Sequence, residues 1–115
     1  DVASPTTSML RIGELEIHHK HRRVLMAGRG VELNHGEYAM LYCMASSPGQ
    51  VFSKAQLYEA AWGEEYLYGT NSVENTIWRL RKKLEKEPRH PTYIKTVVGM
   101  GYKIDIDGEE QESKN

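Results

Sequence analysis

The sequence predicts a single α+β domain, and three observations support this fold class. Apolar and polar residues alternate in short stretches between Leu15 and Leu33, as they do in half-buried strands. Three later segments carry apolar residues at helical spacing. Alternation then returns around two glycines in TYIKTVVGMGYKI, residues 92–104, which is typical of a hairpin. We therefore expect an N-terminal antiparallel sheet, three helices and a C-terminal β-hairpin.

Length and composition fit one such domain. The chain has 115 residues, of which 39% are hydrophobic and 27% charged, as in a soluble globular domain. No apolar run approaches the roughly 18 residues of a membrane span, and the first residues lack the pattern of a signal peptide. A single cysteine excludes an internal disulfide and fits a reducing cytoplasm. We expect a linker at 1–9, the domain at 10–106 and a disordered acidic tail at 107–115.

The sheet is predicted from three strand-like stretches and the turns between them. The stretches are Leu15–Ile17, Val24–Met26 and Val31–Leu33. Polar residues at 18–23 and glycines at 27–30 suit turns. This pattern predicts a small antiparallel meander.

Capping residues mark the first two helices. Asn34 and Ser53 are favourable N-caps, and Glu37 and Gln56 lie three residues further on, where the partner in a capping box lies. A Ser-Ser-Pro-Gly run ends the first helix and Gly63 ends the second.

The third helix has the clearest pattern, and we expect it from about Ser72 to Glu87, before Pro88. Spacings of four, three and four residues create one narrow apolar stripe of Val73, Ile77, Leu80 and Leu84. At about 100° per residue, the opposite face holds Asn75, Trp78, Arg79, Lys82 and Lys86.

Around this helix, a neutral average conceals a basic patch. The whole chain has a net charge of −1, whereas Thr76–Lys103 carries eight basic and two acidic residues, a local net charge of +6. The segment from Ile104 to Asn115 carries five acids and one lysine. Two interpretations fit this charge pattern. The first is a solvated helix face followed by an acidic tail, and the second is a surface that binds nucleic acid.

The order of the predicted elements is that of a winged helix-turn-helix. Two short helices and a loop come first, and a long helix with a basic outer face and a pair of strands follow. The segments LNHGEYAML, VFSKAQLYEAAWG, NSVENTIWRLRKKLE and YIKTVVGMGYKI, in that order, resemble the OmpR/PhoB-type winged-helix DNA-binding domain. This domain is the output domain of many bacterial two-component response regulators. The resemblance covers about residues 10–106 and implies a four-stranded N-terminal sheet, three helices and a hairpin wing.

The resemblance also implies the positions of the contacts. The third helix would enter the major groove of double-stranded DNA with Asn71, Asn75, Thr76, Trp78, Arg79, Arg81 and Lys82. The wing, at the minor groove, and the DNA backbone would involve Lys86, Lys95, Thr96, Val97, Val98, Gly99 and Lys103. The loop from Glu64 to Thr70 falls where relatives contact RNA polymerase, through Glu64, Glu65, Tyr66, Leu67 and Tyr68.

Each candidate on the helix has an alternative. Arg79 suits a bidentate contact to guanine, but it also suits a solvated face that pairs weakly with nearby glutamates. Arg81 lies at the flank of the stripe, where it is positioned to pair. Asn75 suits adenine or a solvated amide, and Trp78 suits a sugar, a thymine methyl group or packing against the loop at 64–70. Lys82 and Lys86 suit phosphates.

Three positions depart from the family pattern, so the family's base preference does not transfer. Thr76 stands where many relatives have histidine or another polar residue. Trp78 stands where small or basic residues are common, and Val98 stands where arginine is frequent.

Other motifs do not indicate chemistry. No carboxylate or cysteine near His18, His19 and His21 completes a recognisable metal site. Cys43 has no recognisable catalytic partner, and Gly99-Met100-Gly101 lacks the lysine and following helix of a phosphate loop. We expect no enzyme, no cofactor and no metal.

The sequence therefore predicts sequence-specific DNA binding in transcription regulation by a cytoplasmic protein. The resemblance implies an upstream receiver domain with a phosphorylated aspartate, tandem dimers on DNA and a possible contact with RNA polymerase. Two alternatives stay open: the winged helix of a one-component or membrane-anchored regulator, and a winged helix that binds another protein.

Overall fold

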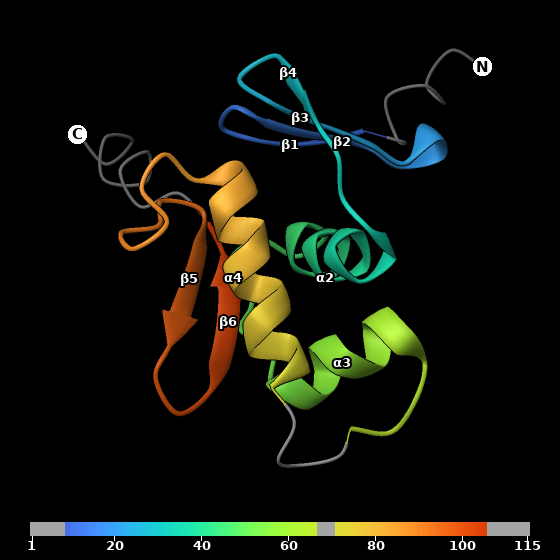
Figure 1. The fold of residues 1–115 in the computed structure, drawn as a ribbon, viewed down its shortest axis with the longest axis vertical. Helices are drawn as coiled ribbons and strands as arrows, with labels where there is room; N and C mark the ends of the chain where they lie inside the picture. The colour runs from blue at the N-terminus through green and yellow to red at the C-terminus, as the bar shows by residue number, and fades with distance from the viewer. Residues whose placement is uncertain (1–8, 67–70, 106–115) are drawn as a thin grey trace.

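A computed structural model describes residues 9–66 and 71–105. It has the predicted order of elements (Figure 1). The first sheet is an antiparallel meander in the order β1 (Met9–Ile12), β2 (Leu15–His18), β3 (Arg23–Met26) and β4 (Arg29–Val31). The helices are α2 (His35–Ala45), α3 (Lys54–Trp62) and α4 (Ser72–Leu84), and the hairpin consists of β5 (Ile94–Val97) and β6 (Gly101–Ile104).

The N-terminal sheet buries one face, as its alternation predicts. Leu15 and Ile17 of β2 are each 1% exposed, whereas Glu16 between them is half-buried. Strand β1 has no such alternation and was implied only by the resemblance. It begins at Met9. The turn between β2 and β3 is a short 3₁₀ helix, His19–His21.

Both predicted capping boxes are present. The Asn34 side chain accepts a hydrogen bond from the Glu37 backbone N–H at 2.9 Å, and the Glu37 side chain accepts one from the Asn34 backbone N–H at 3.0 Å. Ser53 and Gln56 exchange the same pair of hydrogen bonds at the start of α3. Each box satisfies two backbone donors that a helix start would otherwise leave unpaired. Helix α3 ends at Gly63, which adopts a φ of 69°.

Helix α4 ends at Leu84, before the predicted Glu87. The cause is Glu85, which turns inward and is 8% exposed. Its carboxylate accepts hydrogen bonds from the backbone N–H groups of Thr92, Tyr93 and Ile94, the shortest at 2.8 Å. Lys86 consequently lies in the following loop rather than on the helix.

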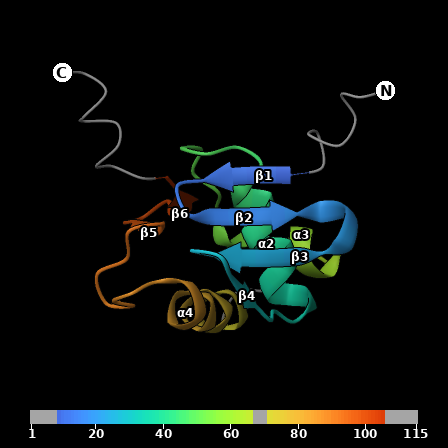
Figure 2. The ribbon, with the colours of Figure 1, turned by 90° about the horizontal axis from the view of Figure 1, so that it is seen from above.

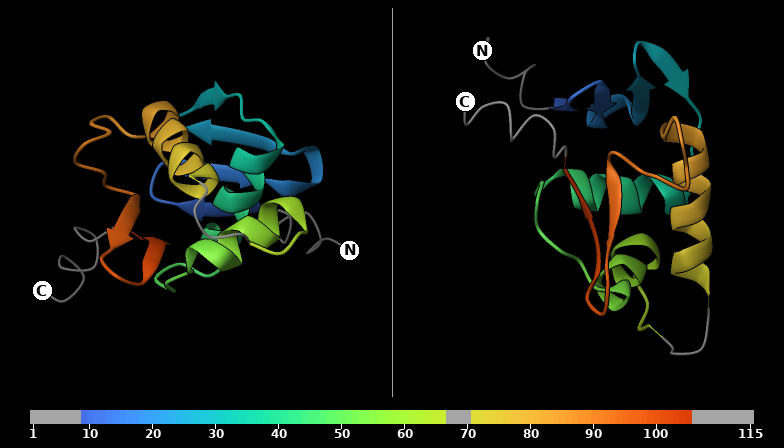
Figure 3. Two further views of the ribbon diagram at one scale, coloured as in Figure 1. Left: turned by 60° about the horizontal axis from the view of Figure 1, so that its bottom comes forward. Right: turned by 90° about the vertical axis from the view of Figure 1, so that its left-hand side faces the viewer.

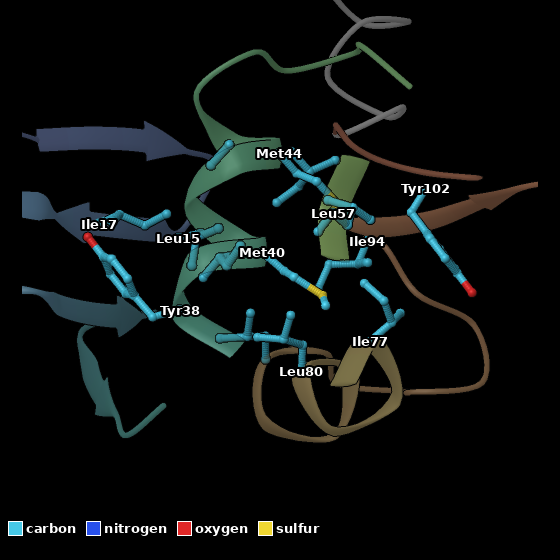
Figure 4. Packing of buried hydrophobic residues seen from close by; sticks show 14 of the residues in the cluster. Leu15, Ile17, Tyr38, Met40, Met44, Leu57, Ile77, Leu80, Ile94 and Tyr102 are labelled. Atoms are coloured by element: carbon cyan, nitrogen blue, oxygen red, sulfur yellow. The ribbon is translucent and has the colours of Figure 1, made fainter. Parts of the chain in front are cut away.

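The core lies between the sheet and the three helices. Met40, Leu41 and Met44 of α2 are fully buried. Met40 and Met44 lie at the centre of the core, between sheet residues on one side and α3, α4 and the hairpin on the other (Figure 4). Seen from above, the sheet covers α2, and α4 lies beyond the β4 edge of the sheet (Figure 2). The predicted apolar stripe of α4 faces this core, and its members Val73, Ile77, Leu80 and Leu84 are at most 5% exposed.

The hairpin stands beside α4 and extends toward α3 (Figure 3). Phe52, between α2 and α3, pairs with Tyr102 of β6: each donates its backbone N–H to the other's carbonyl, at 2.8 and 2.9 Å. This bridge holds the hairpin against the helices. Gly101 allows the approach, because a Cβ at this position would lie 2.0 Å from the Phe52 carbonyl oxygen.

Candidate nucleic-acid interface

A line of exposed side chains runs along α4, opposite its buried stripe. It begins at the N-cap and consists of Asn71, Asn75, Trp78 and Lys82, spaced by four, three and four residues. Trp78 is 40% exposed, which is unusual for so large an apolar side chain. The Asn71 side chain does not cap the helix. We call these four residues the α4 line.

One buried carboxylate fixes the orientation of α4. Glu37 of α2 is 1% exposed and accepts a hydrogen bond from Lys83 Nζ at 2.7 Å and one from Arg79 Nε at 3.1 Å. Burial alone would raise the pKa of the Glu37 carboxyl, but the hydrogen bonds from Lys83, the Asn34 backbone and Arg79 hold it below its ordinary value. Lys83 Nζ also donates to the Glu32 carbonyl at 3.0 Å, which ties α4 to the segment after β4.

The Nε side of the Arg79 guanidinium therefore points toward Glu37 of α2. Its Nε donates to Glu37, and its Nη2 donates to Thr76 Oγ1 at 3.4 Å. The side chain remains 48% exposed. The pairing with Glu37 replaces the weak pairing with nearby glutamates that the sequence left open.

Arg81 joins α4 to the hairpin on the other flank of the line. Its Nε donates to the Ile94 carbonyl at 3.0 Å and its Nη2 to Thr96 Oγ1 at 2.8 Å. The guanidinium lies 5.9 Å from the centre of the Tyr102 ring, and burial lowers the pKa of Arg81. At the helix flank, Arg81 thus bonds a backbone carbonyl and a hydroxyl.

Thr76 differs from the prediction. Its side chain is 1% exposed, so it belongs to the packed side of α4 and has no surface to offer a groove. The helical spacing contains the reason, because Thr76 is three residues from Val73 and four from Leu80, both in the buried stripe.

The hairpin tip is apolar and exposed. Val98 is 91% exposed and Met100 is 62% exposed, on either side of Gly99, whose φ is 79°. The lysines of the hairpin lie further down, opposite one another on β5 and β6. Lys95 Nζ lies 2.7 Å from Asp105 Oδ1, and Lys103 Nζ lies 3.1 Å from Asp105 Oδ2. Burial opposes the charge of Asp105, but both lysines lower the pKa of its carboxyl.

An open groove of about 760 Å³ separates the hairpin tip from the N-terminal ends of α3 and α4. Lys54 of α3 and Glu74 of α4 line it and form an ion pair, with 2.6 Å between Nζ and Oε2. The hydrogen bond from Lys54 lowers the pKa of the Glu74 carboxyl. This pair joins the start of α4 to the start of α3.

Comparison with known proteins places this arrangement in a family. A profile of the family described as "Transcriptional regulatory protein, C terminal" matches residues 28–104. The chain belongs to this family. Its fold and its function, DNA binding in transcription regulation, are those of the OmpR/PhoB-type response-regulator domains. Helix α4 takes the place in this fold of the helix called the recognition helix, and the β5–β6 hairpin takes the place of the wing.

Individual relatives agree with this family. The chain is 40% identical over 96 residues to the uncharacterized transcriptional regulatory protein YcbL of Bacillus subtilis, across 84% of this chain and 42% of YcbL. It is similar to the RstA DNA-binding domain of Klebsiella pneumoniae, solved in complex with the RstA box, at 33% identity and a TM-score of 0.78 over 84% of this chain and 96% of that one. The chain is also similar to DrrB of Thermotoga maritima, an OmpR/PhoB homolog, at 30% identity and a TM-score of 0.77. This match covers 85% of this chain and 44% of DrrB. The chain thus spans less than half the length of YcbL and of DrrB.

The loop after α3 is described only in part. Glu64 and Glu65 are exposed, and Tyr66 packs edge-on against Tyr58, with ring centres 5.4 Å apart. The candidates Leu67 and Tyr68 lie outside the described residues. Trp62 packs across Gly36, where a Cβ would lie 2.9 Å from the indole.

The histidines of the β2–β3 turn have structural contacts. His19 Nδ1 is 2.8 Å from the Tyr38 hydroxyl, and its ring stacks on Tyr42 with 4.1 Å between ring centres. Within residues 9–66 and 71–105, no three histidine, cysteine, aspartate or glutamate side chains are grouped as metal ligands. The same residues include no helix long and apolar enough to cross a membrane.

Sequence reasoning missed the ties that hold the recognition helix. Glu37 was expected only as a capping residue, and Glu85 and Lys83 were not among the candidate site residues. Capping alone explains a glutamate at a helix N-terminus. The sequence therefore contains no separate indication that Glu37 also bonds Arg79 and Lys83 of α4. For Glu85, the signal was its place next to the last residue of the apolar stripe.

Proposed function

We propose that the α4 line enters the major groove while the wing tip lies at the neighbouring minor groove. The observation that carries this proposal is the α4 line itself: two amides, an indole and an ammonium, exposed along one helix face. The major groove admits one α-helix. Because Glu37 and Arg81 tie the two flanks of α4 to α2 and to the wing, the line is held in place before DNA arrives.

Phosphate contacts would come from cations at the end of the recognition helix. Lys82, Lys86 and Arg89 are exposed, and none has an ion-pair partner among the residues that the structure describes. Such cations position a helix on the duplex without reading sequence. Lys95 and Lys103 share Asp105, so they contribute less charge to the wing than their number suggests.

The remaining partners follow from the family. We expect an upstream receiver domain whose phosphorylation controls binding, a cytoplasmic location, tandem binding to DNA and no catalytic activity. The exposed Glu64 and Glu65 beside Tyr66 support a contact with RNA polymerase. If so, replacing both glutamates with lysine would abolish activation in transcription with purified polymerase while leaving DNA affinity within about twofold.

The salt dependence of DNA affinity tests the proposal. The affinity of the 115-residue chain for enriched genomic fragments should be measured by fluorescence anisotropy between low and moderate salt. Neutralising about four to six phosphates predicts a slope of log affinity against log salt of about −4 to −5.

Lys82→Ala should lower affinity on all sequences and make this slope shallower by about 1. Lys20→Ala is the matched control, because Lys20 is an exposed lysine in the turn between β2 and β3. This turn lies away from α4 (Figure 1). An affinity that does not change with salt, or an equal loss in both variants, would contradict the proposed interface.

A further inference from the structure

Arg79 and Arg81 of α4 differ from the α4 line because both guanidinium groups already make hydrogen bonds within the domain. A bidentate contact to guanine needs two parallel N–H donors of one guanidinium. In Arg79 the Nε–Nη2 edge bonds Glu37 and Thr76, and in Arg81 the same edge bonds the Ile94 carbonyl and Thr96. The Nε–Nη2 edge of each guanidinium is therefore occupied within the domain, which leaves the Nη1–Nη2 edge for another partner.

Releasing either arginine would remove a hydrogen bond from a buried acceptor. Glu37 is 1% exposed, and without Arg79 it keeps only Lys83 as a cationic partner. Arg81 bonds the carbonyl of Ile94, a residue that is fully buried. Because an unsatisfied buried polar group is costly, both arginines are retained as ties on either side of the α4 line.

Within the α4 line, the groups that suit base edges are then the amides of Asn71 and Asn75 and the indole of Trp78. Recognition helices contact base edges with their N-terminal residues, which here include Asn75 and Trp78, whereas Lys82 lies further along, nearer the backbone. An asparagine amide pairs bidentately with adenine N6 and N7. An exposed apolar ring suits the C5-methyl group of thymine.

We infer that the recognition helix reads A·T base pairs, with Asn75 on an adenine and Trp78 on a thymine methyl group, and that neither arginine reads guanine. This inference rests on the proposed function. Asn75 and Trp78 are three residues apart, about 4.5 Å along the helix. Base pairs follow one another every 3.4 Å, so the two contacts fall on pairs one or two steps apart.

Selection from a random double-stranded DNA library by the 115-residue chain tests this inference. The enriched half-site should contain the adenine and the thymine at that separation. Asn75→Ala should lose the preference for adenine by about 5- to 150-fold and leave the other positions unchanged. Arg79→Lys keeps a cation beside Glu37 and removes the guanidinium, so it should leave the selected motif unchanged.

Replacing the thymine with deoxyuridine isolates the methyl group. The unmodified chain should bind the uridine duplex about fourfold more weakly, as expected for one buried methyl-sized group. Trp78→Ala should bind both duplexes equally. Thermal unfolding of each variant verifies that it is folded.

The outcomes distinguish this inference from the proposed function. A motif that contains a guanine whose preference disappears in Arg79→Lys or Arg81→Lys would overturn the inference and leave DNA binding intact. So would a motif that does not respond to Asn75→Ala. If the folded chain enriches no motif at all, sequence-specific binding itself is contradicted.

Discussion

At the scale of single residues, neighbours on one helix have different roles because they face different surroundings. Asn75 and Trp78 face outward, Thr76 between them is buried, and Arg79 is turned toward Glu37. A polar residue on a recognition helix is thus not by itself evidence of a DNA contact. What it bonds in the free domain decides whether it is available.

Gly101 shows how a single atom limits the wing. Its backbone has a φ of 140°, and a Cβ would lie 2.0 Å from the Phe52 carbonyl oxygen. This oxygen accepts the bridge hydrogen bond from the Tyr102 backbone N–H. A side chain at this position would therefore disturb the bridge both by its contact with Phe52 and by backbone strain.

Gly101→Ala should destabilise the domain by about 1–3 kcal/mol, because backbone rather than a flexible side chain must move and the new residue would be strained. Urea unfolding measures this difference in the free energy of unfolding. Gly30→Ala is the control, since a Cβ there would come no closer than 4.0 Å to Leu25. Equal stability of the two variants would mean that the hairpin shifts freely past Phe52.

At the scale of elements, α4 and the wing form one unit. Arg81 bonds both the backbone and a side chain of β5, so the wing is oriented by the helix it accompanies. The tip is left with Val98 and Met100 exposed and no charged side chain on the three residues between the strands. We therefore expect this wing to contribute shape and backbone contact to DNA rather than charge.

Val98→Arg should strengthen DNA binding several-fold at low salt and make the salt slope steeper by about 1, because the tip would gain one phosphate contact. Anisotropy titrations at several salt concentrations measure both quantities. Val98→Leu controls for side-chain size. Unchanged affinity and slope in Val98→Arg would show that the tip does not approach the phosphates.

At the scale of the whole molecule, Glu37 connects parts that are distant in sequence. It caps α2, bonds Arg79 and Lys83 of α4, and through Lys83 reaches the segment after β4. Sheet, central helix and recognition helix are therefore joined at one charged group. The protonation of that group should affect the stability of the whole domain.

The pKa of Glu37 is lower in the folded state than its ordinary value of 4.5. The stabilisation from its charge is therefore fully present above pH 4.5 and is lost as the pH falls through the lower, folded pKa. Glu37→Gln should cost about 1.5–3 kcal/mol at neutral pH. In acid, this difference from the unsubstituted chain should shrink.

Urea unfolding of both chains from neutral pH to about pH 3 measures this effect. Glu32→Gln is the control, because the Glu32 side chain is exposed and only its backbone carbonyl takes part in the network. A Glu37→Gln variant that loses stability by the same amount at every pH would contradict a charged Glu37 in the folded domain.

Much of this fold was predictable from local pattern. Hydrophobic spacing identified the buried stripe of α4, and two capping boxes located the starts of α2 and α3. Two features were not predictable in this way. Strand β1 lacks alternation, and α4 ends early because the Glu85 side chain bonds backbone that follows it by seven to nine residues.

By itself, the sequence determined the order of the elements after β1 and the face of α4 that points outward, because each depends on spacing within short segments. It also indicated the family, through four motifs in a fixed order. The tertiary structure decided which of the polar residues near that face are already bonded. Arg79 is joined to Glu37 across 42 positions of sequence, and Arg81 to the wing across 13 and 15. Ties across such separations form only when the packed core brings the elements together, so no local pattern records them.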